Sequence, residues 1–201
     1  MKIIIITGPS GSGKTSLAKK LMAKLENSYT LSTDDFYKTG KISILLSKFI
    51  NSYFDKKISH NGKLLKETIN RILKEKKLNY SYKYDFIRKR KEIIYQKSSN
   101  IDNLIIEGIF TLELIKFISR NDYLLIRLKT SKEICMKRIN KRDYIERGKS
   151  HSKSIEDFLK AWDIYHRKEK SYEILGKGKE LILKKDHNIN TIIKKLSNKT
   201  L

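Results

Sequence analysis

The stretch GPSGSGKTS, which begins at Gly8 directly after the apolar run KIIIIT, constrains the fold more than any other part of the chain. It fits the pattern G-x-x-x-x-G-K-[ST] from Gly8 to Thr15, and apolar residues at helical spacing follow it. A strand, a glycine-rich loop and a helix in this order build a cradle for phosphate, because glycines let backbone N–H groups approach an anion closely. A glycine-rich turn that merely opens a helix is the plainer interpretation, but the fixed positions and both flanks favour the phosphate cradle.

The residues of this loop have separable roles in such a cradle. Lys14 adds a positive charge and is expected to act in catalysis, and the Thr15 hydroxyl is expected to coordinate Mg²⁺. The set expected to bind the phosphate groups of a nucleotide is Gly8, Ser10, Gly11, Ser12, Gly13, Lys14, Thr15 and Ser16.

Apolar runs typical of buried strands alternate with helical patterns along the rest of the chain. Strands are expected at residues 3–6, 29–33, 103–108, 122–128 and 180–185, and helices at 63–75, from Ser131, from Ile155 and at 189–196. Residues 41–51 form an apolar helix or an ordered loop. The alternation predicts an α/β fold with a mostly parallel five-stranded sheet and helices on both faces.

Two segments do not fit the alternation of strands and helices and are expected to be additions to one domain, residues 1–201. Residues 79–86 alternate in character and are rich in aromatic side chains, which indicates an extended edge segment, and residues 92–96 are expected to pair with it. We expect this pair to be a substrate-side insertion at about residues 79–97. The basic helical patterns at about residues 131–170 are expected to form a lid.

Length, composition and cysteine content narrow the class of protein. The 201 residues, 39% of them hydrophobic, suffice for one α/β domain with a core. No apolar run is long enough to span a bilayer, and the short N-terminal apolar run leads directly into the glycine-rich loop, unlike a signal peptide. The single cysteine, Cys135, cannot form an internal disulfide and is expected to be a buried thiol in a helix. A cytoplasmic location without a membrane partner is therefore expected.

The net charge of +23 raises the question of nucleic-acid binding. Lysines are spread over every predicted helix, and the sequence shows no zinc-finger, RRM or helix-turn-helix signature. A chain-wide bias toward Lys, Ile and Asn explains the charge without a specific nucleic-acid partner. Weak, salt-sensitive attraction to polyanions is the expected consequence.

Acidic residues follow two of the predicted strands. Asp34 and Asp35 come after residues 29–33, and Glu107 lies at the end of residues 103–108. Ligands of open parallel sheets bind beyond the carboxyl ends of the strands, so these acids are expected beside the glycine-rich loop. Asp34 is expected to accept the proton of an attacking hydroxyl or to align that hydroxyl, with Asp35 pointing away because side chains alternate in an extended segment. Glu107 is expected to organise Mg²⁺. An Asp pair that caps a helix and a buried structural Glu are the alternatives.

The stretch KRINKRDYIERGK concentrates basic residues on one predicted helix. Arg138 and Arg142 share a helical face, and Arg147 and Lys149 flank Gly148, which is expected to hinge or cap the helix. Such a cluster can close over a transferring phosphoryl group and offset its charge, and the nearby acids are not expected to neutralise it. A solvated basic helix is the alternative in so lysine-rich a chain.

Five stretches, GPSGSGKTS, STDDFYK, YDFIRKR, LIIEGIF and RINKRDYIERGK, occur in the order and spacing of the uridine kinase (uridine–cytidine kinase) family, which the chain resembles over about residues 1–170. The resemblance implies a P-loop kinase fold, MgATP as phosphate donor, and transfer of the γ-phosphate to the 5′-hydroxyl of a nucleoside, most of all uridine or cytidine. Whether the chain forms a homo-oligomer stays open.

The resemblance also implies roles for single residues. Asp34 matches the family's catalytic acid. Arg142, Arg147 and Lys149 match basic positions of the lid, the first two with a catalytic role and the last as a nucleotide contact. The implied substrate-binding residues are Tyr37, Asp55, Tyr84 and Arg90.

Three positions depart from the family pattern. Lys89 stands where a histidine usually helps to read the pyrimidine, and Ile139 replaces one arginine of the lid. Asp55, in YFDKKIS, is the nearest match to an aspartate that holds the ribose hydroxyls. The stretches DDFYK and LIIEG also resemble nicotinamide riboside kinase, while ERGK favours the uridine kinase side. A kinase of another hydroxylated metabolite, such as nicotinamide riboside or a sugar, stays an alternative, as does a nucleotide-binding regulator or nucleic-acid-binding NTPase without metabolite kinase activity.

Overall fold

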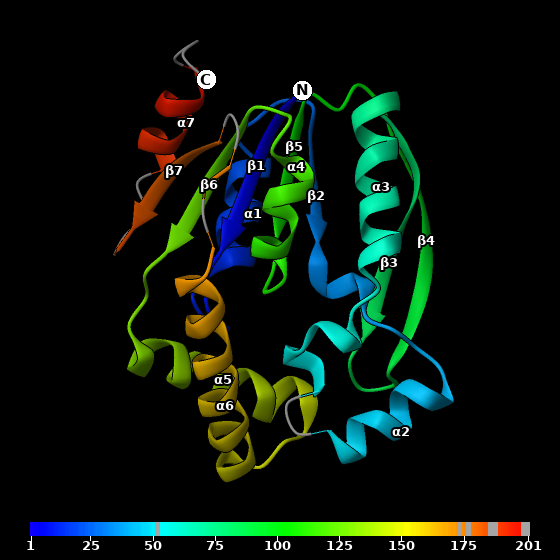
Figure 1. Ribbon diagram of the computed structural model, residues 1–201, viewed down its shortest axis with the longest axis vertical. Coiled ribbons are helices and arrows are strands. Elements are labelled where there is room, and N and C mark those ends of the chain that lie inside the picture. Colours follow the sequence, from blue (N-terminus) through cyan, green and yellow to red (C-terminus); the bar gives the residue numbers. More distant parts are fainter. Residues whose placement is uncertain (51–52, 173, 176–177, 185–188, 198–201) are drawn as a thin grey trace.

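Five parallel strands form the main sheet of the computed structural model, which describes residues 1–50, 53–172, 174–175, 178–184 and 189–197. The strands are β1 (Lys2–Thr7), β2 (Ser28–Ser32), β5 (Asn103–Glu107), β6 (Tyr123–Leu128) and β7 (Gly178–Leu183). They lie in the order β2-β5-β1-β6-β7 (Figure 1), and every pairing between them is parallel. The predicted five-stranded parallel sheet is confirmed.

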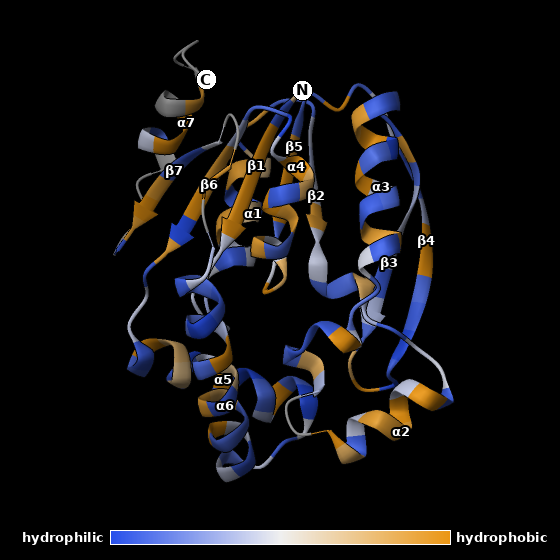
Figure 2. Cartoon of the chain, viewed as in Figure 1, coloured by the Kyte–Doolittle hydropathy of each residue, from blue (hydrophilic) through white to orange (hydrophobic). Residues whose placement is uncertain are grey.

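Both faces of this sheet are covered by helices, as the alternating sequence pattern predicts. The run Ile3–Ile6 of β1 is buried, and alternate isoleucines of a strand point to opposite faces. One pair packs with α3 (Gly62–Glu75) and α4 (Ile115–Ile118), and the other with α1 (Lys14–Met22) and α7 (Ile189–Ser197). Figure 2 shows the inner strands as largely apolar, whereas α3 carries both apolar and polar positions along its length.

A two-stranded hairpin forms the addition predicted near residues 79–97. β3 (Leu78–Asp85) pairs antiparallel with β4 (Arg90–Ser98), so the predicted pairing is confirmed. The prediction of an edge segment is wrong in one respect, because the hairpin is a separate sheet and does not extend the main one. Its tyrosines explain the difference: the Tyr82 ring packs edge-on against Phe36 at 5.6 Å, and Tyr84 packs on Tyr37 at 5.1 Å. Side chains, rather than strand pairing, thus dock the hairpin on the segment that follows β2.

Several helix boundaries differ from the sequence-based expectation by a few residues. α5 (Lys132–Arg147) begins as predicted, but α6 (His151–Lys170) begins before Ile155. The Ser150 hydroxyl accepts a hydrogen bond from Lys153 N at 3.3 Å and starts a polar first turn, which apolar spacing does not reveal. Residues 41–49 form a helix, α2 (Lys41–Phe49), rather than an ordered loop. Residues 51 and 185, at the ends of two predicted elements, lie outside the described residues.

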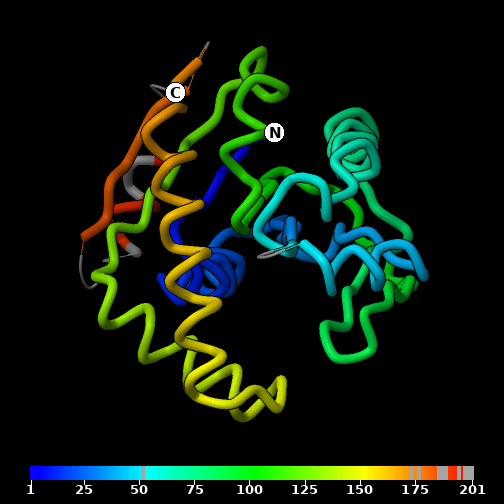
Figure 3. The backbone as a smooth tube through the Cα atoms, turned by 60° about the horizontal axis from the view of Figure 1, so that its bottom comes forward, coloured from blue at the N-terminus to red at the C-terminus, as the bar shows by residue number. Residues whose placement is uncertain are grey.

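Two groups of elements lie beyond the carboxyl ends of the main strands. The antiparallel pair α5 and α6 lies on one side, and α2 with the far end of the β3–β4 hairpin lies on the other (Figures 1 and 3). The loop after β1 lies against α5, where Gly11 comes close to the Cys135 backbone. Among the described helices, none is both long and apolar enough to cross a membrane.

Candidate active site

The glycine-rich loop joins β1 to α1, so the N-terminus of α1 and the backbone N–H groups of the loop face the same space. Gly11 has a φ of +80°, and a Cβ at this position would lie 2.5 Å from the Cys135 carbonyl oxygen of α5. Only glycine lets the loop pass so close to that helix. The Lys14 ammonium donates hydrogen bonds to the carbonyls of Gly8 and Pro9 at 2.9 and 3.0 Å. Burial lowers the pKa of Lys14, although the negative charges of Glu107 and Asp34 act to raise it.

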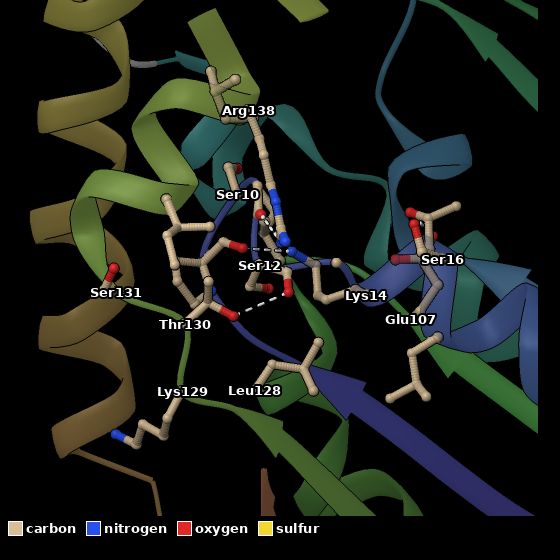
Figure 4. Close-up of a pocket in the computed structure, with 18 of the residues that line it drawn as sticks. Ser10, Ser12, Lys14, Ser16, Glu107, Leu128, Lys129, Thr130, Ser131 and Arg138 are labelled. Carbon is tan, nitrogen blue, oxygen red and sulfur yellow. Dashed lines mark hydrogen bonds between the residues drawn. The ribbon is translucent and has the colours of Figure 1, made fainter. Parts of the chain in front are cut away.

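A cavity of about 1810 Å³ adjoins this loop. Residues 9–17 line one wall, Asp34 and Glu107 reach the cavity from the strand ends, and Arg138 and Arg142 reach it from α5. Figure 4 shows Arg138 extending to the loop beside Lys14, where its Nη1 donates to the Gly11 carbonyl at 3.3 Å. Of the predicted nucleotide-binding set, Ser10–Ser16 line the cavity, whereas Gly8 and Lys149 are not among its described lining residues.

The two residues predicted to hold a metal ion lie together. Glu107 Oε1 accepts hydrogen bonds from Thr15 Oγ1 at 3.3 Å and from Ser32 Oγ at 2.9 Å. Burial raises the pKa of the Glu107 carboxyl, and the charge of Asp34 acts in the same direction. A hydroxyl and a carboxylate beside a phosphate cradle fit Mg²⁺, which is usually held by one or two carboxylates, water and substrate phosphates. Consistent with so sparse a site, no group of three His, Cys, Asp or Glu among the described residues could hold a metal.

Asp34 and Asp35 point to different places, although not for the reason predicted. The segment Thr33–Phe36 is a 3₁₀-helix rather than an extended stretch. Asp34 lines the cavity, whereas Asp35 Oδ1 accepts a hydrogen bond from the Tyr84 backbone N at 3.0 Å and so ties β3 to this turn. Burial raises the pKa of Asp35.

A single glycine makes room for the Asp34 turn. Gly108 follows β5 with a φ of +135°, and a Cβ there would overlap the Thr33 hydroxyl and lie 3.2 Å from Asp34 Oδ1. The residue after Glu107 must therefore lack a side chain for Asp34 to lie beside the strand end.

An aromatic cluster gathers two of the predicted substrate-binding residues. The Tyr37 ring lies 5.1–5.9 Å from the rings of Phe54, Tyr84, Phe86 and Phe110, and its hydroxyl donates to the Phe54 carbonyl at 2.8 Å. Burial, with smaller contributions from Asp34 and Asp55, raises the pKa of Tyr37 well above its usual value.

Asp55 is half-buried at the end of the 3₁₀-helix Tyr53–Asp55. Burial raises the pKa of its carboxyl to about 6, and the charges of Asp34 and Asp157 add to this effect, while Lys149 and Lys168 oppose it. When it is ionised, a carboxylate in this position accepts hydrogen bonds from a ligand readily, because burial leaves it few hydrogen bonds from water.

The basic residues predicted on one helix converge on an acid that the sequence analysis did not single out. Asp143 is 3% exposed and pairs with Arg142, Arg147 and Lys149, so the expectation that nearby acids leave this cluster unneutralised is wrong. The adjacent pair Arg-Asp in the sequence was the available signal. Gly148 adopts a left-handed conformation as the C-cap of α5. Of the two roles expected for this residue, hinge or cap, the cap is confirmed.

Ile139 and Cys135 are buried with Phe158 in a small apolar cluster between α5 and α6, as expected for the Cys135 thiol. Ile139 thus stabilises the contact of the two helices. Trp162 and His166 of α6 line the cavity as well, and no sequence pattern indicated them.

Two basic residues of the hairpin turn lie apart from the phosphate cradle. Arg90, predicted to bind substrate, is exposed and pairs with Glu92 on the same strand at 2.7 Å, so the structure does not bring it to the cavity. Lys89 Nζ donates to Ser47 Oγ of α2 at 3.2 Å and lies 5.9 Å from the centre of the Phe54 ring.

The fold and the cavity define this chain as a P-loop kinase. Solved structures share its fold. YFH7 from Saccharomyces cerevisiae matches with a TM-score of 0.72 and 10% identity, over 92% of this chain and 93% of that chain. D-glycerate 3-kinase from Cryptococcus neoformans matches with a TM-score of 0.58 and 14% identity, over 90% of this chain and 85% of that chain.

The chain belongs to the phosphoribulokinase/uridine kinase family, whose model matches residues 3–172. Its relatives include uridine kinase of Borrelia hermsii, 30% identical over 163 residues that cover 79% of this chain and 75% of that protein. Uridine kinase of Ureaplasma parvum is 31% identical over 162 residues, which cover 76% and 74%. The resemblance noted in the sequence is confirmed at the level of the family.

Proposed function

We propose that this kinase transfers the γ-phosphate of MgATP to the 5′-hydroxyl of a nucleoside, most of all uridine or cytidine. The observation that carries the proposal is that the phosphate loop, the Thr15–Glu107 pair and Asp34 face one cavity. We further propose that residues 1–201 form one kinase domain in which α5 and α6 act as a lid and the hairpin lies on the substrate side. A cytoplasmic location, without a membrane or nucleic-acid partner, is part of the same proposal.

On the donor side, the loop backbone of residues 8–16 and Lys14 bind the phosphates, and Lys14 must exchange its bonds to the Gly8 and Pro9 carbonyls for bonds to phosphate oxygens. Thr15 and Glu107 would hold Mg²⁺, which neutralises charge on the phosphates when bound. Arg142 and Arg147, with Lys149, offset the negative charge that spreads over the phosphoryl group in the transition state.

On the acceptor side, Asp34 takes the proton of the attacking hydroxyl at its carboxylate, or holds that hydroxyl in line. Tyr37 and Tyr84 are only 2% and 4% exposed, so they support the partly buried rings of Phe54 and Phe86, which offer faces on which a base can stack.

Lys168 Nζ lies 4.9 Å from the centre of the Phe110 ring and donates to the Asp55 backbone carbonyl at 3.4 Å, so Asp55 lies beside the aromatic cluster. Its ionised carboxylate can accept hydrogen bonds from two ribose hydroxyls. Arg90, exposed on β4, is left out of the proposed acceptor site.

A kinase of another small hydroxylated metabolite is the second candidate, and Lys89 is the observation that favours it. Its ammonium lies over Phe54 at the edge of the aromatic cluster and can only donate hydrogen bonds. An acceptor with an anionic group at this edge suits Lys89 better than a neutral pyrimidine does. A sugar acid therefore belongs in the substrate panel, beside nicotinamide riboside and sugars. A regulator that only binds nucleotide has no use for Asp34 in the cavity.

The test is ATP-dependent phosphorylation of a panel of nucleosides, nicotinamide riboside and sugars, followed by Asp34→Asn with the best acceptor. Because the variant keeps the size of the side chain but loses its basicity, kcat should fall about 10²–10⁴-fold. MgATP affinity should be kept, which can be measured by fluorescence because Trp162, the only tryptophan, lines the cavity.

Asp35→Asn is the matched control. Its amide oxygen can still accept the Tyr84 N–H bond, so we expect a much smaller change in kcat. A sensitive Asp35 with a tolerant Asp34 would contradict the assignment, and a protein that binds MgATP but phosphorylates nothing in the panel would favour the regulator.

A further inference from the structure

Asp143, on the last turn of α5, collects the cationic side chains at the end of that helix. Its Oδ1 accepts hydrogen bonds from Arg142 Nη2 and Nε at 3.0 and 3.2 Å and lies 3.4 Å from Arg147 Nη1. Its Oδ2 lies 3.6 Å from Lys149 Nζ. The residue is only 3% exposed, whereas its three partners are all partly exposed to solvent.

The backbone of Asp143 builds the same assembly. Its carbonyl accepts hydrogen bonds from the backbone N of Gly148, the C-cap of α5, and from Lys149 N at 3.1 Å. The left-handed turn at Gly148 therefore folds Lys149 back over the helix end, toward the Asp143 carboxylate. One residue thus ends the helix and fixes the direction in which the chain leaves it.

Charge makes the two parts of this assembly depend on each other. A buried carboxylate without partners is strongly unfavourable, and three cations gathered at one place repel each other unless an anion lies between them. Each of the three cations also makes a contact of its own. Arg142 lines the cavity, the Arg147 guanidinium lies 4.3 Å from the centre of the Phe86 ring, and Lys149 Nζ pairs with Asp157 of α6 at 2.9 Å.

We propose that Asp143 is a positioning residue that holds Arg142, Arg147 and Lys149 as one set for the phosphoryl transfer. The inference rests on the proposed function, since the set acts on the phosphoryl group. Arginine and lysine side chains are long and flexible, and cations already held in place need no rearrangement when charge develops in the transition state. Asp143 itself does not touch the reacting atoms.

The sign of the expected effect separates this role from a merely structural one. Asp143→Asn keeps the shape and one acceptor oxygen but removes a negative charge beside the three cations. Attraction for the nucleotide should therefore stay equal or increase, while the cations lose their common anchor. A displacement of about 1 Å in such groups can cost about 10²-fold in rate. We expect kcat to fall about 10–100-fold and the dissociation constant of MgATP, measured by Trp162 fluorescence, to stay the same or decrease.

Glu156→Gln is the matched control. It removes one negative charge from α6, where Glu156 is exposed and pairs with Lys153 and Lys160 rather than directly with any of the three cations. We expect its kcat to stay within about twofold of wild type, since exposed ion pairs contribute little. If Asp143→Asn shows no thermal transition, Asp143→Glu, which keeps the charge but displaces it, is tested instead, with a similar fall in kcat and an unchanged dissociation constant of MgATP as the expected result.

The readouts distinguish failure of this inference from failure of the proposed function. If the wild-type protein phosphorylates no acceptor in the panel, the same variants are compared by their slow hydrolysis of MgATP, which needs the same cations. A fall in kcat at kept or tighter MgATP binding, with Glu156→Gln unaffected, supports the positioning role. A variant that melts earlier but turns over at the wild-type rate when folded, or one whose MgATP affinity falls as much as its kcat, overturns it.

Discussion

Replacement of Asp55 by asparagine should change both acceptor binding and stability, each with its own dependence on pH. Burial, with Asp34 and Asp157, raises the pKa of this carboxyl from 3.8 to about 6. At pH 7 about 90% of Asp55 is therefore ionised, and at pH 5 about 10%. If only the carboxylate holds the acceptor, the apparent KM for the acceptor should rise about tenfold between pH 7 and pH 5 in the wild-type protein.

The effect on stability has a defined sign. The folded protein favours the neutral carboxyl, so the contribution of Asp55 to stability is greatest below pH 3.8 and is lost as the pH rises through about 6. A shift of about two pKa units corresponds to at most about 3 kcal/mol. Asp55→Asn cannot ionise, so it should unfold later than wild type at pH 8, by up to about 6–12 °C in Tm, and show little difference near pH 4.

Steady-state kinetics from pH 5 to 8 with varied acceptor and saturating MgATP, together with thermal unfolding of both proteins, test this reasoning. We expect a high and pH-independent acceptor KM for Asp55→Asn. The reasoning is refuted by a wild-type acceptor KM that does not change between pH 5 and pH 7, by the same pH profile in the variant, or by a stability difference between the two proteins that does not grow with pH.

Two further substitutions test the phosphate loop and the turn that carries Asp34. Lys14→Ala should lower kcat by about 10²-fold or more, because it removes a fixed positive charge beside the phosphates. Thermal unfolding should show that the fold is kept. A kcat near that of wild type would contradict the kinase assignment. Gly108→Ala should destabilise the fold by about 2–5 kcal/mol in urea unfolding, since its Cβ would lie 3.0 Å from Thr33 Cβ at a φ of +135°. Gly62→Ala is the control, because the nearest atom to a Cβ at this position is 3.9 Å away. Its stability should equal or slightly exceed that of wild type. An equal loss of stability in both variants would contradict the packing argument.

The parts of the site that follow from short sequence patterns were predictable. The glycine-rich loop, the acid at the end of β5 and the acid after β2 each depend on a strand end and a few neighbouring residues. The sequence pattern located all five strands of the sheet. The inner strands β1, β5 and β6 are nearly continuous apolar runs, and β2 alternates between buried and half-buried residues. The place of the hairpin was not predictable in this way, since it depends on contacts of Tyr82 and Tyr84 with a segment about 45 residues earlier.

The anchor of the basic cluster shows a second limit. Spacing placed Arg138 and Arg142 on one helical face, but it said nothing of which acid would be buried among the cations. The turn at Gly148 was a local signal, but the burial of Asp143 also depends on the packing of α6 against α5, which is not a local property of the sequence. Ile139 is a second example of this limit. It stands where the family pattern noted in the sequence has a basic residue, and only the structure shows that it packs between α5 and α6.

The separation of the hairpin from the main sheet has a consequence for how such an enzyme can change. The backbone pairings that carry the phosphate loop run through β1, β5 and β6, whereas the hairpin is attached to them through a few side chains and the bond from Tyr84 N to Asp35. Substitutions at the hairpin turn, Lys89 among them, therefore leave the strand register untouched. If the hairpin lies on the substrate side, as proposed, selection in nature or in the laboratory can change the acceptor through substitutions at this turn while the strands that carry the phosphate loop stay the same.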